Sequence, residues 1–260
     1  MRIASIQLEM DDRKTKKDRL EQVTGMLAEL AGREQKPDLV LLPELWGAGY
    51  FNFSAYLTHS ETALGETFTA LSPLAKEAGF YLLAGSILER EGDSLYNSAL
   101  LIGPGGNLAA KYRKINLFGY ESKEALLLTP GKLPVVVDTE WGKWGIATCF
   151  DLRFPEIYRQ MLAAGADVFL VVAAWPAARL EHWQLFNKVR ALENQCYLVS
   201  CNCAGKMNGV EFAGHSMVVD PWGIVNKSAG SRPVIMEVEI DLGKVERTRA
   251  EFPLSRVSHS

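Results

Sequence analysis

Two features are missing from this 260-residue sequence: a long hydrophobic run and a marked excess of charge of either sign. No apolar run approaches the length of a membrane-spanning helix, and residues 1–8 lead into acidic residues without the apolar core of a signal peptide. The formal net charge of −3 gives no electrostatic reason to expect binding to nucleic acid or to an anionic membrane. We therefore expect a cytoplasmic protein that has no nucleic-acid or membrane partner.

Cysteine is scarce, and the four in the chain are Cys149, Cys196, Cys201 and Cys203. A chain of this length without a secretion signal needs no disulfide bond. Paired zinc ligands are usually separated by two residues, whereas Cys201 and Cys203 alternate in a strand-like segment and no second pair follows. The sequence therefore predicts core thiols, no metal site and no cofactor.

Hydrophobic residues make up 48% of the chain, enough for a substantial core. The apolar patterns predict helices at residues 12–33, 66–78, 155–162, 182–195 and 242–251. They predict strands at residues 3–8, 38–44, 81–88, 96–102, 108–112, 135–138, 146–148, 167–174, 197–203, 214–219 and 234–240. Because strands alternate with helices and hairpins are frequent, we expect an α/β fold of mixed sheets with helices outside. No repeat, low-complexity segment or linker interrupts the pattern, so one domain is predicted over residues 1–260.

Cys149 stands where a buried strand is expected to give way to a helix. The apolar, β-branched residues 146–148 precede it, and Pro155 suits the first turn of the helix that follows. Free N–H groups and the positive dipole end at such a junction favour a thiolate and can bind an oxyanion. The alternative is that Cys149 is a small buried hydrophobe, as most cysteines are.

Three predicted strands that are distant in sequence end near a chemically useful side chain: Glu44, Lys114 and Cys149. Hydrolysis of a carbon–nitrogen bond needs a nucleophile, a base that activates it, and positive charge that holds the oxyanion. Cys149 can attack, and Glu44 can take its proton, protonate the leaving amine and later activate water. Lys114 can hold the oxyanion together with the backbone N–H of Phe150.

The segments that carry these residues resemble the three signature segments of the nitrilase superfamily, the carbon–nitrogen hydrolases. They are residues 42–44 (LPE), 112–118 (YRKINLF) and 148–156 (TCFDLRFPE), which occur in the order of the family. The resemblance extends over nearly the whole chain and identifies Glu44, Lys114 and Cys149 with the catalytic Glu-Lys-Cys triad. It implies a four-layer αββα sandwich of two mixed β-sheets between helical layers, a homodimer, and metal-free thiol catalysis through an acyl-enzyme.

The family also has a second active-site glutamate in the loop after the lysine. Glu124 is our first choice for this residue and Glu121 the second, because Glu124 stands closer to the turn at Pro130-Gly131. A neutral glutamate at this position could position the substrate or help the proton relay.

Further segments resemble the ω-amidase branch of the family, which cleaves the terminal amide of small 2-oxo-acid amides such as 2-oxoglutaramate. They are residues 175–179 (WPAAR), 182–183 (HW), 190–195 (RALENQ) and 212–216 (FAGHS). Asn116, Ala174 and Cys203 depart from the residues common in the family, which are histidine, asparagine and arginine. The departures leave the triad intact, so they concern the substrate and not the chemistry. A small linear amide is the expected substrate.

Tyr50, Phe118 and Trp175 are placed to line a substrate pocket. Asp151 and Arg153, directly after the nucleophile, are predicted to form a structural pair that fixes the turn.

Four alternatives to this function are open. The chain could hydrolyse N-carbamoyl amino acids or nitriles with the same triad, or it could be a catalytically inactive protein that uses the fold to bind a ligand. His182 or His215 could also pair with Cys149 in a thiol hydrolase of another type, although neither lies in a papain-like context.

Overall fold

Two six-stranded β-sheets face each other in the computed structural model, which describes residues 1–254. The last six residues of the predicted domain, 255–260, lie outside the described part. The first sheet has the strand order β15 (Val234–Glu239), β1 (Arg2–Gln7), β3 (Leu39–Leu41), β4 (Tyr81–Glu91), β5 (Ser94–Ile102), β6 (Leu108–Arg113). The second has the order β14 (Val225–Ser228), β13 (Met217–Val219), β10 (Tyr197–Asn202), β9 (Val168–Ala173), β8 (Gly142–Thr148), β7 (Val135–Thr139). Each sheet contains both parallel and antiparallel pairs, so the predicted mixed sheets are confirmed.

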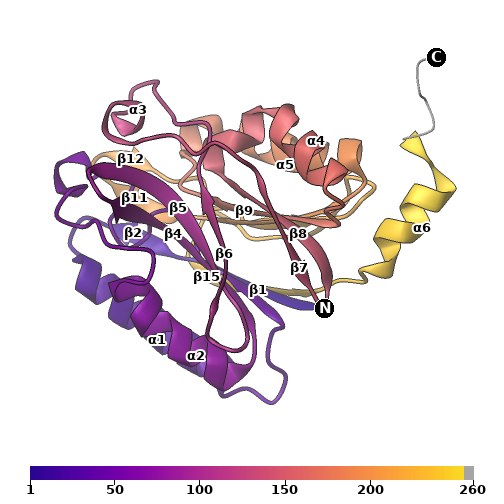
Figure 1. Ribbon diagram of the computed structural model, residues 1–260, viewed down its shortest axis with the longest axis horizontal. Coiled ribbons are helices and arrows are strands. Elements are labelled where there is room, and N and C mark those ends of the chain that lie inside the picture. Colours follow the sequence, from indigo (N-terminus) through magenta and orange to yellow (C-terminus); the bar gives the residue numbers. More distant parts are fainter. Residues whose placement is uncertain (255–260) are drawn as a thin grey trace.

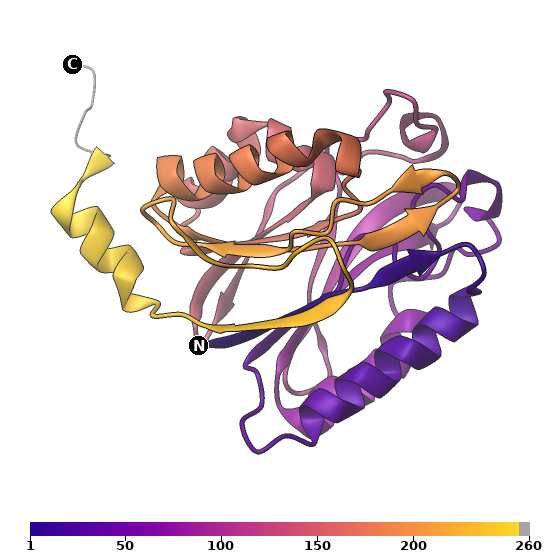
Figure 2. The same ribbon diagram turned by 180° about the vertical axis from the view of Figure 1, so that it is seen from behind.

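Helices cover the outer face of each sheet (Figures 1 and 2). On the first sheet lie α1 (Lys16–Ala31) and α2 (Glu66–Ala78), and on the second lie α4 (Pro155–Ala163) and α5 (Leu180–Asn194). The four-layer αββα sandwich that the resemblance implied is confirmed. A short α3 (Glu124–Leu127) stands in the loop after β6, and α6 (Gly243–Glu251) projects beyond the sheets.

Alternating side chains of the buried strands supply the cores between these layers. In β3, Leu39 and Leu41 face the second sheet, whereas Val40 packs in the cluster beneath α1 and α2. In β8, Ile146 lies between the sheets and Ala147 packs toward α4 and α5. Because the period of a strand is two residues, one apolar run can fill two cores. This explains why the strands of both sheets are apolar on both faces.

Helix boundaries follow local capping signals. Thr15 and Asp18 form a reciprocal capping box, so α1 begins at Lys16 instead of at the predicted residue 12. The predicted bounds of α2 are confirmed, and Gly79 ends this helix in the left-handed conformation that glycine adopts without strain.

The strand predictions differ from the structure mainly at short edge elements. A small third sheet of β12 (Val210–Glu211), β11 (Ala204–Met207) and β2 (Glu9–Asp11) was not predicted, and neither was β14. Strands of two to four residues are too short for a clear periodic signal. The strand predicted at residues 38–44 ends at Leu41, because Pro43 has no N–H to donate to a neighbouring strand. Within residues 1–254, no helix has both the length and the apolar character needed to cross a membrane.

Candidate active site

The three side chains singled out from the sequence meet at one end of the sandwich. Glu44 follows β3, Lys114 follows β6, and Cys149 follows β8, so the first sheet supplies the carboxylate and the ammonium and the second supplies the thiol. The Nζ atom of Lys114 lies 2.8 Å from Oε1 of Glu44. Glu44 is fully buried, Lys114 is 1% exposed and Cys149 is 8% exposed. Residues separated by up to 105 positions in sequence thus share one buried site.

Main-chain hydrogen bonds fix where each of these residues stands. The N–H of Glu44 donates to the carbonyl of Ala173 at the end of β9, and the N–H of Ala174 donates to Oε2 of Glu44 at 2.8 Å. The N–H of Lys114 donates to the carbonyl of Asn97 on β5. Glu44 is therefore tied across to the second sheet, while Lys114 continues the ladder of the first.

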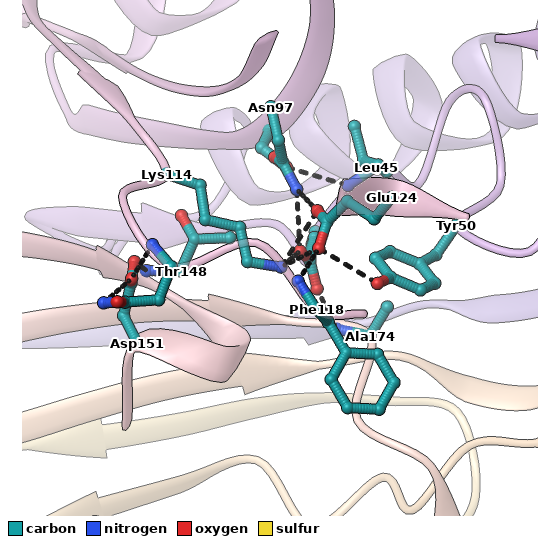
Figure 3. A network of polar contacts seen from close by, with 12 residues as sticks. Leu45, Tyr50, Asn97, Lys114, Phe118, Glu124, Thr148, Asp151 and Ala174 are labelled. Atoms are coloured by element: carbon teal, nitrogen blue, oxygen red, sulfur yellow. Dashed lines mark hydrogen bonds and ion pairs between the residues drawn. The ribbon is translucent and has the colours of Figure 1, made fainter. Parts of the chain in front are cut away.

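Glu124 is the second carboxylate at this site. Its two oxygens lie 2.9 and 3.0 Å from Nζ of Lys114, and they also accept hydrogen bonds from the N–H of Phe118 and the hydroxyl of Tyr50 (Figure 3). Glu124, our first choice from the sequence, is therefore the glutamate whose carboxylate contacts Lys114. Glu121, the second choice, lies apart on the wall of an outer cavity.

Burial and neighbouring charge set the ionisation of the cluster. Burial raises the pKa of the Glu44 carboxyl above its ordinary value, and the charge of Lys114 opposes this rise. Burial alone would lower the pKa of Lys114, but the charges of Glu124 and Glu44 outweigh it and place that pKa well above its ordinary value. Lys114 is therefore a permanent cation in this site and cannot serve as a base.

Cys149 occupies the sharp turn between β8 and the short 3-10 helix η2 (Cys149–Arg153), which leads into α4. The predicted position at a strand-to-helix junction is confirmed, and the backbone of Cys149 has a positive φ of 48°. The expectation that this junction favours a thiolate is wrong for the resting site. Burial and the facing carboxylate of Glu44 raise the pKa of the thiol well above its ordinary value, more than the charge of Lys114 and the N–H of Ala174 lower it. The thiol is thus neutral and needs a base.

Asp151 holds the turn at Cys149 in place. Its carboxylate accepts a hydrogen bond from the N–H of Thr148 (Figure 3). It also accepts hydrogen bonds from the hydroxyl of Tyr112 and from both the backbone and side-chain N–H groups of Asn116. The predicted pairing with Arg153 is wrong. The Arg153 guanidinium turns the other way and contacts Nδ1 of His182 at 3.0 Å, because four N–H and O–H donors already satisfy the carboxylate.

A narrow, largely apolar cavity opens beside Cys149. Tyr50, Phe118 and Trp175, which were predicted to line a pocket, all border it, together with Phe150. It adjoins a wider outer cavity, and both share residues that include Phe118 and Arg179.

Two arginines at this cavity were not recognised from the sequence as pocket residues. Arg153 and Arg179 both border it, and burial, then the like charge of Arg179, lowers the pKa of the Arg153 guanidinium. The segment 175–179, which resembles the ω-amidase branch, contained a signal for Arg179. The position of Arg153 four residues after the nucleophile was noted but assigned to the turn.

The residues that depart from the family pattern support this scaffold. Asn116 bonds Asp151, Ala174 donates its N–H to Glu44, and the thiol of Cys203 lies 3.7 Å from the carbonyl oxygen of Glu44. The histidines have other partners: Nδ1 of His182 contacts Arg153, and Nδ1 of His215 contacts the carbonyl of Ala213. Among residues 1–254, no hydrogen bond joins either histidine to Cys149, and no group of three or more His, Cys, Asp or Glu side chains could hold a metal ion.

Comparison with known proteins identifies the family. The family model described as "Carbon-nitrogen hydrolase" matches residues 2–250. The chain belongs to the carbon–nitrogen hydrolase family. This carbon–nitrogen hydrolase is 32% identical over 260 residues to the 2-oxoglutaramate amidase of Paenarthrobacter nicotinovorans. The match covers 97% of this chain and 87% of that protein. It is 34% identical over 265 residues to the Omega-amidase NIT2 of Mus musculus, covering 97% of this chain and 93% of the mouse protein.

A solved structure agrees with this assignment. Saccharomyces cerevisiae Nit3, described as a member of branch 10 of the nitrilase superfamily, superimposes with a TM-score of 0.89 at 28% identity. The match covers 98% of this hydrolase and 95% of Nit3. The predicted membership of the nitrilase superfamily is confirmed.

Proposed function

We propose that this hydrolase is a thiol amidase that cleaves the terminal amide of a small 2-oxo acid, with 2-oxoglutaramate as the first candidate. Relatives named 2-oxoglutaramate amidase and omega-amidase at 32% and 34% identity support the amide substrate. The convergence of Glu44, Lys114 and Cys149 at one cavity carries the mechanism.

The first half-reaction forms an acyl-enzyme. The thiol proton of Cys149 moves to the Glu44 carboxylate as Sγ bonds to the carbonyl carbon of the amide. The oxyanion that develops is held by the ammonium of Lys114 and the backbone N–H of Phe150. Glu44 then gives its proton to the amide nitrogen, the carbon–nitrogen bond breaks, and ammonia leaves a thioester on Cys149.

The second half-reaction returns the enzyme to its starting state. Glu44 takes a proton from water as the water oxygen attacks the thioester carbonyl. The carbon–sulfur bond breaks, the proton passes to Sγ of Cys149, and the acid product leaves. Because burial raises the pKa of Glu44, this carboxylate is a stronger base than one in water, as both half-reactions require.

The Lys114 ammonium serves as a fixed positive charge in this scheme. Glu44 and Glu124 hold it within 3.0 Å, so it needs no rearrangement when the oxyanion forms. Glu124 therefore supports the reaction by orienting Lys114.

The substrate class follows from the cavity. Arg153 and Arg179 border it, and within the described chain neither guanidinium forms an ion pair with a carboxylate. A carboxylate on the substrate is the complementary group for two such cations.

An ammonia-release screen tests the proposal. The panel contains 2-oxoglutaramate, 2-oxosuccinamate, glutamine, asparagine, N-carbamoyl amino acids, simple nitriles and a neutral amide of matched length. We expect ammonia from the 2-oxo-acid amides, far less from the neutral amide, and none with Cys149→Ala.

Other outcomes reassign or remove the function. Activity confined to the carbamoyl compounds or to the nitriles moves the enzyme to those branches of the superfamily. Ammonia release by Cys149→Ala at the wild-type rate contradicts the acyl-enzyme, and no release from any compound by the wild type favours a ligand-binding role.

We also propose that the enzyme is a homodimer, as the resemblance implies. The support is an apolar patch near the C-terminal ends of α5 and α6, formed by Leu192, Trp222, Ile224 and Phe252. Ile224 is 61% exposed, and the rings of Trp222 and Phe252 lie 6.0 Å apart. A patch of this kind is typical of a surface that a second subunit covers.

A further inference from the structure

Asn97 stands between the two carboxylates of the site. It lies on β5, is 1% exposed, and pairs through its main-chain carbonyl with the N–H of Lys114. Its Nδ2 atom lies 2.8 Å from Oε1 of Glu44 and 2.9 Å from Oε1 of Glu124 (Figure 3). The side chain thus contacts both carboxylates, and its backbone holds the catalytic lysine.

The formal charges of the side chains at this site do not sum to zero. Two carboxylates share one ammonium, which leaves a formal charge of −1 among fully buried side chains. The charge of Glu124 adds to burial in raising the pKa of Glu44. Since a base must be ionised before it can accept a proton, this repulsion works against the role of Glu44.

The orientation of the Asn97 amide follows from the same contacts. With Nδ2 toward the carboxylates, each of its two hydrogens meets one Oε1 atom, while Oδ1 has no partner among the described residues. The flipped amide would place Oδ1 against two carboxylate oxygens, which repel it. Asn97 is therefore a neutral donor to both anions at once.

We propose that Asn97 is a positioning residue: its amide donates one N–H to Glu44 and the other to Glu124, so that Glu44 stays ionised and aimed at Cys149. This rests on the proposed amidase function. A purely structural residue would not need to be polar here, because the strand pairing uses only its backbone. An apolar side chain of similar size would fill the space without the cost of burying an amide whose oxygen is unpaired.

Asn97→Leu and Asn97→Asp test the assignment. Leucine removes both donors at nearly constant volume, and aspartate keeps the shape but replaces two N–H groups with an acid. Asn194→Leu is the matched control, because Asn194 is also a buried asparagine with an unpaired Oδ1 but lies at the end of α5, where its amide bonds only the carbonyl of Arg190.

Two readouts are followed against pH for each variant. One is kcat/KM with 2-oxoglutaramate, and the other is the rate at which iodoacetamide alkylates Cys149, mapped by mass spectrometry. The acid side of both profiles reports the ionisation of the coupled Glu44–Cys149 pair. The alkylation profile needs no substrate, so it tests Asn97 even if the wild type releases no ammonia and the proposed function fails.

We expect Asn97→Leu to move the acid side of both profiles upward by about one pH unit and to lower kcat more than it changes KM. Asn97→Asp moves the profiles at least as far, because it adds a third acid to the cluster. Asn194→Leu loses stability but keeps the wild-type profiles. The assignment is overturned if Asn97→Leu and Asn97→Asp keep the wild-type pH profiles, whatever their stability.

Discussion

The chemistry of single side chains at this site depends on burial more than on sequence context. Cys149 follows a pattern that in isolation favours a thiolate, yet burial and the carboxylate of Glu44 keep its thiol neutral. The same burial makes Glu44 a better proton acceptor. In the proposed mechanism, these two shifts match the nucleophile Cys149 to its base Glu44, and Lys114 supplies the positive charge of the buried site.

Lys114→Ala tests the central cation. We expect the activation barrier that kcat/KM reports to rise by on the order of 3 kcal/mol, since an oxyanion donor is lost. Removing the cation also leaves two buried carboxylates unpaired. The free energy of unfolding, measured in urea, is therefore expected to fall by roughly 3–5 kcal/mol. Kinetics and urea titration measure the two effects.

Lys132→Ala, at an exposed lysine, serves as the control for Lys114→Ala and is expected to match the wild type in both measurements. Retention of near-normal turnover by Lys114→Ala would contradict the oxyanion role.

The hairpin formed by β5 and β6 shows how an element places two residues at once. Ser98 pairs with Arg113, so the next pair along is Asn97 with Lys114, which faces the site. Glu89 of β4 lies beside Ser98 and is 2% exposed. Its carboxylate accepts hydrogen bonds from Ser98, Lys111 and Arg113. This cluster locks the register that sets Lys114 opposite Asn97.

Glu89→Gln is expected to reduce the free energy of unfolding by about 2 kcal/mol at pH 7, because it removes the charged partner of two cations. Burial raises the pKa of Glu89, but Arg113 and Lys111 lower it further, to about 2 from an ordinary 4.5. The lowered pKa means that the stabilisation is complete above pH 4.5 and is lost as pH falls toward 2.

Urea unfolding of both proteins between pH 7 and pH 3 measures the effect of Glu89→Gln. The difference between them should shrink steadily below pH 4.5. A difference that stays constant over this range would show that the charge of Glu89 is not its cause.

Over the whole molecule, the two ends of the chain share one core. Ile3 of β1 and Val245 of α6 both belong to the apolar cluster between the sheets. We propose that the chain forms a single domain, because neither sheet has a core of its own on this inner face.

Ile224→Glu tests the proposed homodimer. A charge in the middle of an apolar interface is costly to bury, so light scattering should show a dimer for the wild type and a monomer for the variant. Leu64→Glu is the control, since Leu64 is 59% exposed but precedes α2, away from the patch. A wild type that is monomeric at all concentrations, or an Ile224→Glu variant that remains dimeric, contradicts the interface.

Local patterns in the sequence determined much of this molecule. Apolar runs with a period of two residues specify strands that bury both faces, and the capping signals at Thr15, Gly79 and Pro155 specify where helices begin and end. The segments around Glu44 and Cys149 specify the family, because their residues are adjacent in sequence as well as in space.

Tertiary structure alone decided the rest. Glu124 is buried against Lys114 whereas Glu121 is not, Arg153 faces the cavity, and Asn97 bridges two carboxylates. No pattern around Asn97 distinguishes it from any other strand residue. The reason is physical: the ionisation of a group depends on water lost and charges gained, and here the partners lie 10 to 130 positions away along the chain.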